Sequence, residues 1–142
     1  MSKAALSMEA TMLESRTISI SINRQWNEVY EAVWRPEDFA RWASGLSKSS
    51  LSRDGDGWKA EGPDGPVRIS FTDHNDFGVM DHCVTLGDGS VIYVPLRIIR
   101  NGDGAEVLFT LFRQPDMSDA KFTADADWIE RDLLALKVLV TR

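Results

Sequence analysis

The feature that most constrains this chain is an apolar stripe along its C-terminal segment. After Ser118, which suits a helix N-cap, apolar residues recur at steps of four, three, four, three and four: Phe122, Ala126, Ile129, Leu133, Leu136 and Val140. This spacing predicts a long amphipathic helix, and its apolar arc widens through Trp128, Ala135 and Leu139. A stripe of this length needs a large apolar surface to lie against.

The middle of the chain predicts that surface, because short apolar runs alternate there with turn residues. Breaks rich in glycine and aspartate divide the segment at 54–57, 62–66, 74–77, 87–89 and 101–104. Glycine and aspartate adopt turn dihedrals that β-branched residues adopt only at a cost. The pattern predicts six antiparallel strands in a meander over 46–113, and the first of them, around 46–53, is weakened by its serines.

The residues before the meander predict one more strand and two short helices. Residues 16–22 alternate isoleucine with threonine and serine, which is typical of a half-buried strand. Asn23 is predicted to cap the first helix, and Pro36 to open a second helix that Gly45 closes. The apolar faces of these helices are Trp26, Val29, Tyr30 and Val33, then Phe39, Trp42 and Ala43.

Together these elements predict an α+β fold in which a curved seven-stranded antiparallel sheet wraps around the C-terminal helix. The two short helices lie between the first and second strands. A length of 142 residues suits one domain, which we expect to span residues 16–142. Residues 1–15 lack a clear periodicity and are predicted to be a mobile leader.

The turns of the meander also predict which side chains face the concave side of the sheet. A three-residue turn at 87–89 pairs Val84 with Ile92 and His82 with Val94, and a four-residue loop at 101–104 pairs Leu96 with Phe109. A loop at 74–77 places Phe71 opposite Met80. In this register the concave face is apolar except for His82, whereas Asp81 and Cys83 point outward, so Asp81, His82 and Cys83 do not form a catalytic cluster.

Four stretches resemble a known family: GVMDHCVT at 78–85, LGDG at 86–89, VPLR at 94–97 and EVLFTLFRQP at 106–115. With the order of elements, they are similar to a polyketide cyclase-like branch of the START-like, or SRPBCC, superfamily, which has a helix-grip fold. The resemblance covers residues 16–142. It implies an internal cavity for a hydrophobic or aromatic ligand between the sheet and the last helix. It implies no single reaction, because members include lipid carriers, cyclases and co-chaperones.

We expect the ligand to be a small hydrophobic molecule, lipid-like or polyketide-like, that is enclosed by inward-facing side chains. The predicted ligand-binding residues are His82, Trp42, Trp58, Phe71, Met80, Val94, Phe109 and Ile129. Aromatic side chains grip planar or acyl ligands, and a neutral imidazole can hydrogen-bond a carbonyl or phenol. His82 is equally compatible with a core histidine whose nitrogens are satisfied by backbone or water, and the aromatic residues with plain core.

Two other functions remain open at this point. A cyclase or dehydratase would hold a polyketide-like substrate and use His82 in proton transfer. A co-chaperone or regulatory protein would act through its outer surface. There Tyr93 and Phe112 are either a homodimer patch or ordinary surface residues, and the acidic residues of the last helix, among them Asp132, are predicted to be solvated.

Composition narrows the remaining classes. The net charge of −6 has the wrong sign for a generic nucleic-acid binder, and no apolar run reaches the roughly 18–20 residues of a membrane span. The single cysteine and two histidines predict no disulfide and no usual zinc site, and the sequence lacks the glycine-rich motifs of nucleotide binding. We therefore expect a soluble cytoplasmic protein without metal or cofactor.

Overall fold

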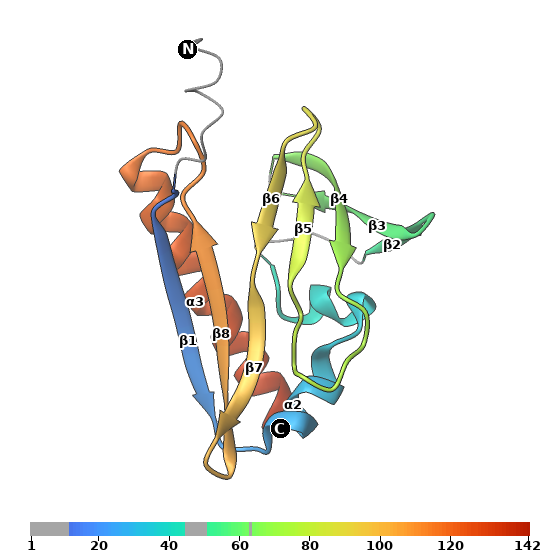
Figure 1. Cartoon of the computed structure of the whole chain (residues 1–142), viewed down its shortest axis with the longest axis vertical. Coiled ribbons are helices and arrows are strands. Elements are labelled where there is room, and N and C mark those ends of the chain that lie inside the picture. Colours follow the sequence, from blue (N-terminus) through green and yellow to red (C-terminus); the bar gives the residue numbers. More distant parts are fainter. Residues whose placement is uncertain (1–11, 45–50, 63) are drawn as a thin grey trace, which may run out of the picture.

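The computed structural model describes residues 12–44, 51–62 and 64–142 and contains strands, short helices and one long helix (Figure 1). Their order confirms the predicted α+β class. The elements are β1 (Ser15–Ile22), α2 (Trp26–Val33), η1 (Pro36–Arg41), β2 (Ser52–Asp54), β3 (Gly57–Gly62), β4 (Gly65–Phe71), β5 (His82–Thr85), β6 (Val91–Val94), β7 (Leu96–Asn101), β8 (Gly104–Phe112) and α3 (Asp119–Val140). Residues 1–11 of the leader predicted at 1–15, the predicted helix end at Gly45, and most of the weak strand at 46–53 lie outside the described residues, and Ser15 already belongs to β1.

The prediction of one seven-stranded sheet is wrong in its details. The described strands form a three-stranded sheet, β1-β8-β7, and a five-stranded sheet, β2-β3-β4-β5-β6, all antiparallel. The strand expected through 91–101 is divided into β6 and β7 at Pro95, which has no backbone N–H to offer a ladder. One bridge, between Val79 and Arg97, links the two sheets across this division.

A carboxylate on the convex side holds the division at Pro95. Asp81 Oδ1 accepts a hydrogen bond from the backbone N–H of Leu96 at 2.9 Å, while Asp81 Oδ2 accepts from the Tyr93 hydroxyl and from Arg97 Nη2, both at 2.9 Å. Burial tends to raise the pKa of Asp81, but the hydrogen bonds from Arg97, Leu96 and Tyr93 outweigh it and leave the pKa below its ordinary value. The Asp81 carboxylate is therefore ionised at every pH at which an ordinary aspartate is ionised.

The register of the meander agrees with the sequence at two turns and differs at the third. His82 lies opposite Val94 and Leu96 opposite Phe109, as predicted. Phe71, however, lies opposite His82 rather than Met80, because the loop after β4 is longer than the expected turn. The Asn75 side chain organises that loop: its Oδ1 accepts from two backbone N–H groups and its Nδ2 donates to two carbonyls. A shift of two residues keeps every side chain on its predicted face.

Helix α3 packs against the concave side of β1 and β8, so that it lies behind these strands in Figure 1. Ser118 caps the helix as predicted, since its Oγ accepts a hydrogen bond from the backbone N–H of Lys121. The predicted stripe is buried along its whole length: Phe122, Ala126, Ile129, Leu133, Leu136 and Val140. No helix among the described residues combines the length and hydropathy that a membrane span requires.

Two local predictions about the helices are wrong. Helix α2 begins at Trp26 after Gln25, not after Asn23, because the chain first makes a tight turn in which the Arg24 N–H donates to the Ile22 carbonyl. Asp132 on α3 is only 8% exposed rather than solvated, and its Oδ1 accepts a 2.6 Å hydrogen bond from the Ser44 hydroxyl. A distant polar partner therefore compensates for the burial of this carboxylate.

Candidate ligand-binding site

His82 lies on the concave face at the start of β5 and is 4% exposed. Its Nδ1 is 3.1 Å from the carbonyl oxygen of Met80. Because a carbonyl can only accept, Nδ1 carries the proton in the neutral ring and Nε2 is left as an acceptor. Within the described residues, Nε2 has no hydrogen-bond partner.

Burial keeps the His82 ring neutral. Desolvation lowers the pKa of His82 to about 4, against the weaker opposing effects of the Met80 carbonyl and the Asp81 charge. At neutral pH the side chain is therefore an uncharged group with one free acceptor nitrogen.

The lowered pKa predicts how stability depends on pH. Between pH 6.5 and about 4 an unfolded chain protonates this histidine whereas the folded chain does not, so acidification favours unfolding. The stability that the neutral ring provides is fully present above pH 6.5. Its complete loss, reached below about pH 4, lowers the free energy of unfolding by about 3 kcal/mol. His82→Phe should flatten this part of a stability-against-pH curve measured by urea denaturation. Parallel curves for the two proteins would contradict the buried neutral state.

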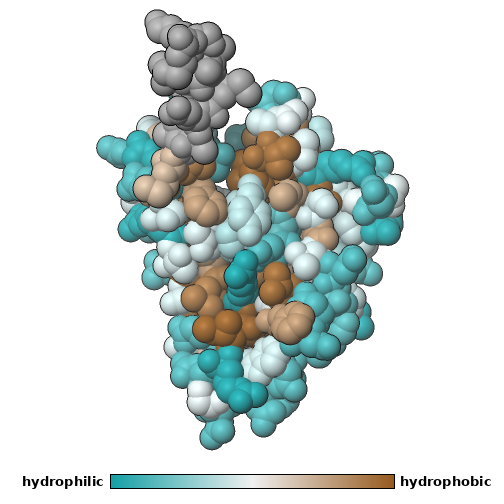
Figure 2. All heavy atoms as spheres, viewed as in Figure 1, coloured by the Kyte–Doolittle hydropathy of each residue, from teal (hydrophilic) through white to brown (hydrophobic). Residues whose placement is uncertain are grey.

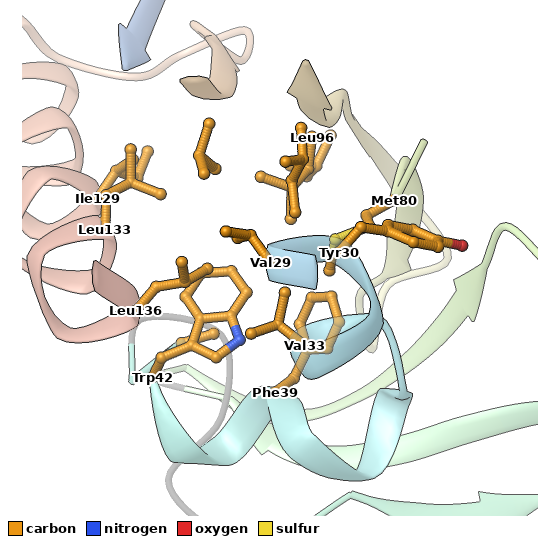
Figure 3. Close-up of a cluster of buried hydrophobic side chains, with 14 of the residues drawn as sticks. Val29, Tyr30, Val33, Phe39, Trp42, Met80, Leu96, Ile129, Leu133 and Leu136 are labelled. Atoms are coloured by element: carbon orange, nitrogen blue, oxygen red, sulfur yellow. The ribbon is translucent and has the colours of Figure 1, made fainter. Parts of the chain in front are cut away.

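Two aromatic rings contact the imidazole, and a third ring, that of Trp42, packs behind one of them. The Phe71 centroid is 5.4 Å from that of His82, and the Phe39 ring meets His82 edge-on at 5.6 Å. Phe39 also contacts Phe71 at 4.7 Å and Trp42 at 5.2 Å. We call these four residues (Phe39, Trp42, Phe71 and His82) the aromatic cluster. It joins the sheet to η1, and Figure 3 shows Phe39 and Trp42 turned from η1 toward the apolar core.

Phe39 belongs to the cluster although sequence reasoning did not name it as a site residue. Its apolar helix face was predicted, and its burial at 1% exposure confirms that face. The sequence does not show against which part of the sheet the short helix lies. The position of η1 is therefore the information that would have identified Phe39.

The aromatic cluster contains a donor that no described residue satisfies. The indole nitrogen of Trp42 is buried and has no hydrogen-bond partner among residues 12–44, 51–62 and 64–142, and the side chain is 3% exposed. Trp34 Nε1 is likewise buried without a partner, in a separate contact with the His74 ring. A buried N–H that is left unpaired costs about 1–3 kcal/mol. With Nε2 of His82, the cluster thus holds one free donor and one free acceptor among rings.

The remaining predicted residues lie outside the cluster, on the concave face of the sheet or, for Ile129, on α3. Trp58 on β3 is half-buried opposite Ile69 of β4, and Arg53 lies over the Trp58 ring at 5.0 Å. Val94 lies opposite His82, and Met80 hydrogen-bonds through its N–H to the Leu96 carbonyl. Phe109 is partly buried, while Met80, Val94 and Ile129 belong to the buried core. The structure thus brings His82, Trp42 and Phe71 together through Phe39.

Two surface hollows of the described structure lie elsewhere. One, of about 290 Å³, is bordered by α2, the loop after β4 and β7, and includes Trp26, Phe77 and Arg100. The other, of about 370 Å³, is bordered by Arg16, Arg113 and Phe122 near the start of α3. None of the predicted site residues borders either hollow. Phe39 packs directly on Phe71 and His82, so a ligand that enters between these rings would displace side chains of η1 or the sheet.

The convex face carries Tyr93 and Phe112, which the sequence predicts to be either a homodimer patch or ordinary surface residues. The Tyr93 and Phe112 rings stack with centroids 6.2 Å apart, and Tyr93 is exposed. Figure 2 shows hydrophobic residues of this side gathered in separate areas with hydrophilic residues between them. The patch stays a prediction.

Comparison with known proteins shows what this architecture is similar to. No family model matches the chain, and no curated protein does. Solved structures do match. XoxI from Bacillus cereus superposes with a TM-score of 0.71 at 13% identity, over 91% of this chain and 96% of its own. The Aha1 dimer from Colwellia psychrerythraea gives 0.66 at 15% identity, over 90% and 96%.

DynU16, a protein of the dynemicin biosynthetic locus, gives a TM-score of 0.66 at 16% identity. The match covers 89% of this chain and 47% of DynU16. The chain shares their fold. The comparison supports the predicted helix-grip architecture, in which antiparallel strands pack against a C-terminal helix. Sequence identities this low show the fold alone, so the function has to be inferred from the site.

Proposed function

We propose that this protein binds a small hydrophobic molecule, lipid-like or polyketide-like, between the concave face of the sheet and the helices. The observation that carries the proposal is the unpartnered N–H of Trp42 within a cluster of rings that also holds the free Nε2 of His82. The ligand would contact the predicted set: His82, Trp42, Trp58, Phe71, Met80, Val94, Phe109 and Ile129. That DynU16 belongs to a biosynthetic locus is compatible with a polyketide-like ligand.

The chemistry of the cluster favours a ligand that carries a hydroxyl on an aromatic or acyl skeleton. A hydroxyl can donate to Nε2 of His82 or accept from the Trp42 N–H, and so suits either group. Each apolar contact adds about 25 cal/mol per Å² of buried surface before the cost of association. Binding would require η1 to move, because its rings now fill the space beside His82. η1 is a single 3₁₀ segment of six residues without a side-chain N-cap, so its displacement breaks few backbone hydrogen bonds.

The cyclase or dehydratase alternative receives less support. A general base works best when its pKa lies near the operating pH, and burial brings the pKa of His82 to about 4. The neighbouring Asp81 carboxylate is engaged by Tyr93, Leu96 and Arg97 on the opposite face of the sheet.

A matched pair of probes tests the proposal. 2-Naphthol and naphthalene have nearly the same shape, but only the former carries a hydroxyl. We expect the protein to bind 2-naphthol about tenfold more tightly in a fluorescence titration, since satisfying one buried polar group is worth about 1–3 kcal/mol and about 1.4 kcal/mol is a factor of ten.

The variants Trp42→Phe and His82→Phe should each reduce the preference for 2-naphthol while leaving naphthalene binding in place. Trp34→Phe is the matched control, because it also removes a buried, unpartnered indole N–H, but from a ring that contacts His74 and lies outside the aromatic cluster. If neither probe binds, or if Trp42→Phe and His82→Phe both keep the preference for 2-naphthol, the proposed site is wrong.

A further inference from the structure

Strand β1 is a free edge of the three-stranded sheet. It pairs with β8 on one side, and within the described chain no strand pairs with its other side (Figure 1). At eight residues it is longer than most edge strands. Its outer edge therefore presents a row of backbone groups that another strand could pair with.

The ladder with β8 determines which residues present those groups. Arg113 N–H donates to the Glu14 carbonyl at 2.8 Å, in the same register that pairs Ser15 with Phe112. In an antiparallel ladder the hydrogen-bonded pairs alternate, so even-numbered residues of β1 bond to β8 and odd-numbered residues direct their N–H and C=O away from it. The outward residues are Ser15, Thr17, Ser19 and Ser21. Among the described residues, their side chains are exposed and no backbone hydrogen bond occupies this edge.

The edge lacks the devices that usually prevent strands from pairing. From Thr17 to Ile22 there is no charge, proline, glycine or bulge. The opposite edge of the fold differs, because β2 has only three residues, of which Arg53 and Asp54 are charged. The isoleucines of β1 are also incompletely covered: Ile18 and Ile20 are half-buried, whereas Val107, directly opposite Ile20 on β8, is fully buried.

We propose that β1 pairs with β1 of a second copy of this chain, antiparallel and centred on Ile18, to form one continuous six-stranded sheet. This register pairs Ser15 with Ser21 and Thr17 with Ser19 of the second copy, so all four outward residues find partners. Every such pair exchanges two backbone hydrogen bonds.

The side chains of β1 are self-complementary in this arrangement. Hydroxyls face hydroxyls on the convex side, as Thr17 and Thr110 already do at 2.9 Å within one copy. On the concave side, Ile18 faces Ile18 of the second copy and covers the apolar area that β8 and α3 leave exposed. A second copy is favoured over an unrelated peptide because the same alternation and the same uncharged edge occur on both sides of the two-fold axis.

Sedimentation of the full chain tests the pairing. We expect a dimer, and Ser19→Pro should raise its dissociation constant about tenfold or more, because proline removes an outward N–H from each copy and no bond to β8. Ser19→Ala keeps that N–H and should leave the dissociation constant within about twofold. Circular dichroism and thermal unfolding verify that both variants fold. A monomeric parent chain, or equal dissociation constants for Ser19→Pro and Ser19→Ala, would overturn the proposal.

Paired charges test the register. The double variant Thr17→Lys/Ser19→Lys places like charges opposite each other in both halves of the interface and should dissociate the dimer. Thr17→Lys/Ser19→Glu places opposite charges there and should retain it. If both double variants are equally monomeric, the register centred on Ile18 is wrong.

Discussion

Replacing Phe39 with alanine is expected to lower the free energy of unfolding by about 3–5 kcal/mol, as for other fully buried phenylalanines. The ring is 1% exposed and contacts Trp42, Phe71 and His82, so its removal leaves a cavity where η1 meets the sheet. Urea denaturation followed by tryptophan fluorescence measures the loss. The cavity would also be large enough to change the affinity for naphthalene, which the same samples can report.

Phe77→Ala is the matched control, because that ring is 77% exposed in the loop after β4. Its effect should stay within about 0.5 kcal/mol, the usual range for surface substitutions. A Phe39→Ala loss as small as that of Phe77→Ala would show that η1 contributes little to the folded state, contrary to its packing here.

Gly78→Ala should destabilise the protein by about 2–5 kcal/mol. Gly78 has a φ of +71°, and a Cβ at this position would overlap the backbone carbonyl oxygen of Ile98. The left-handed conformation costs an L-residue about 1–2 kcal/mol, and the overlap adds about 1–3 kcal/mol. Because Ile98 N–H donates to the Gly78 carbonyl at 2.9 Å, relief of the overlap would break the contact between the loop and β7.

Gly89→Ala separates the two contributions. Gly89 has a φ of +87°, but nothing lies within 4 Å of its added Cβ. It should therefore lose only about 1–2 kcal/mol from backbone strain. Equal losses in the two variants, measured by thermal and urea unfolding, would show that the close approach of Gly78 to β7 is unimportant.

Most of the fold follows from local patterns, and the differences arise where distant groups intervene. Alternation along each strand places His82, Phe71 and Phe109 on one face of the sheet. A register error of two residues leaves every side chain on the same face. The loop around Asn75 is longer than a turn because one side chain makes four hydrogen bonds to backbone, and composition does not reveal such a network. Pro95 was visible in the sequence, yet its effect depends on a carboxylate fourteen positions away, Asp81, that takes over the next N–H.

The site could be predicted only in part. An inward histidine among apolar residues can be read from alternation, and its burial is confirmed. The contact of Phe39 with His82 depends on how η1 docks on the sheet, which no periodicity specifies. The buried Trp42 N–H is a property of packing alone, since a sequence shows that a donor exists but not that it lacks an acceptor. Asp132 is the converse case, because an apparently solvated carboxylate is buried beside Ser44.

The hydrogen bonds to Asp81 lie where the two sheets meet. The sheet that carries α3 and the sheet that carries the aromatic cluster are also joined there by the chain through Pro95, by the Val79–Arg97 bridge, and by the hydrogen bond from the Thr110 N–H to the Pro95 carbonyl. Asp81 binds this junction from the convex side, whereas the aromatic cluster lies on the concave side. A substitution of Asp81 would therefore act on the angle between the two sheets without touching the candidate site.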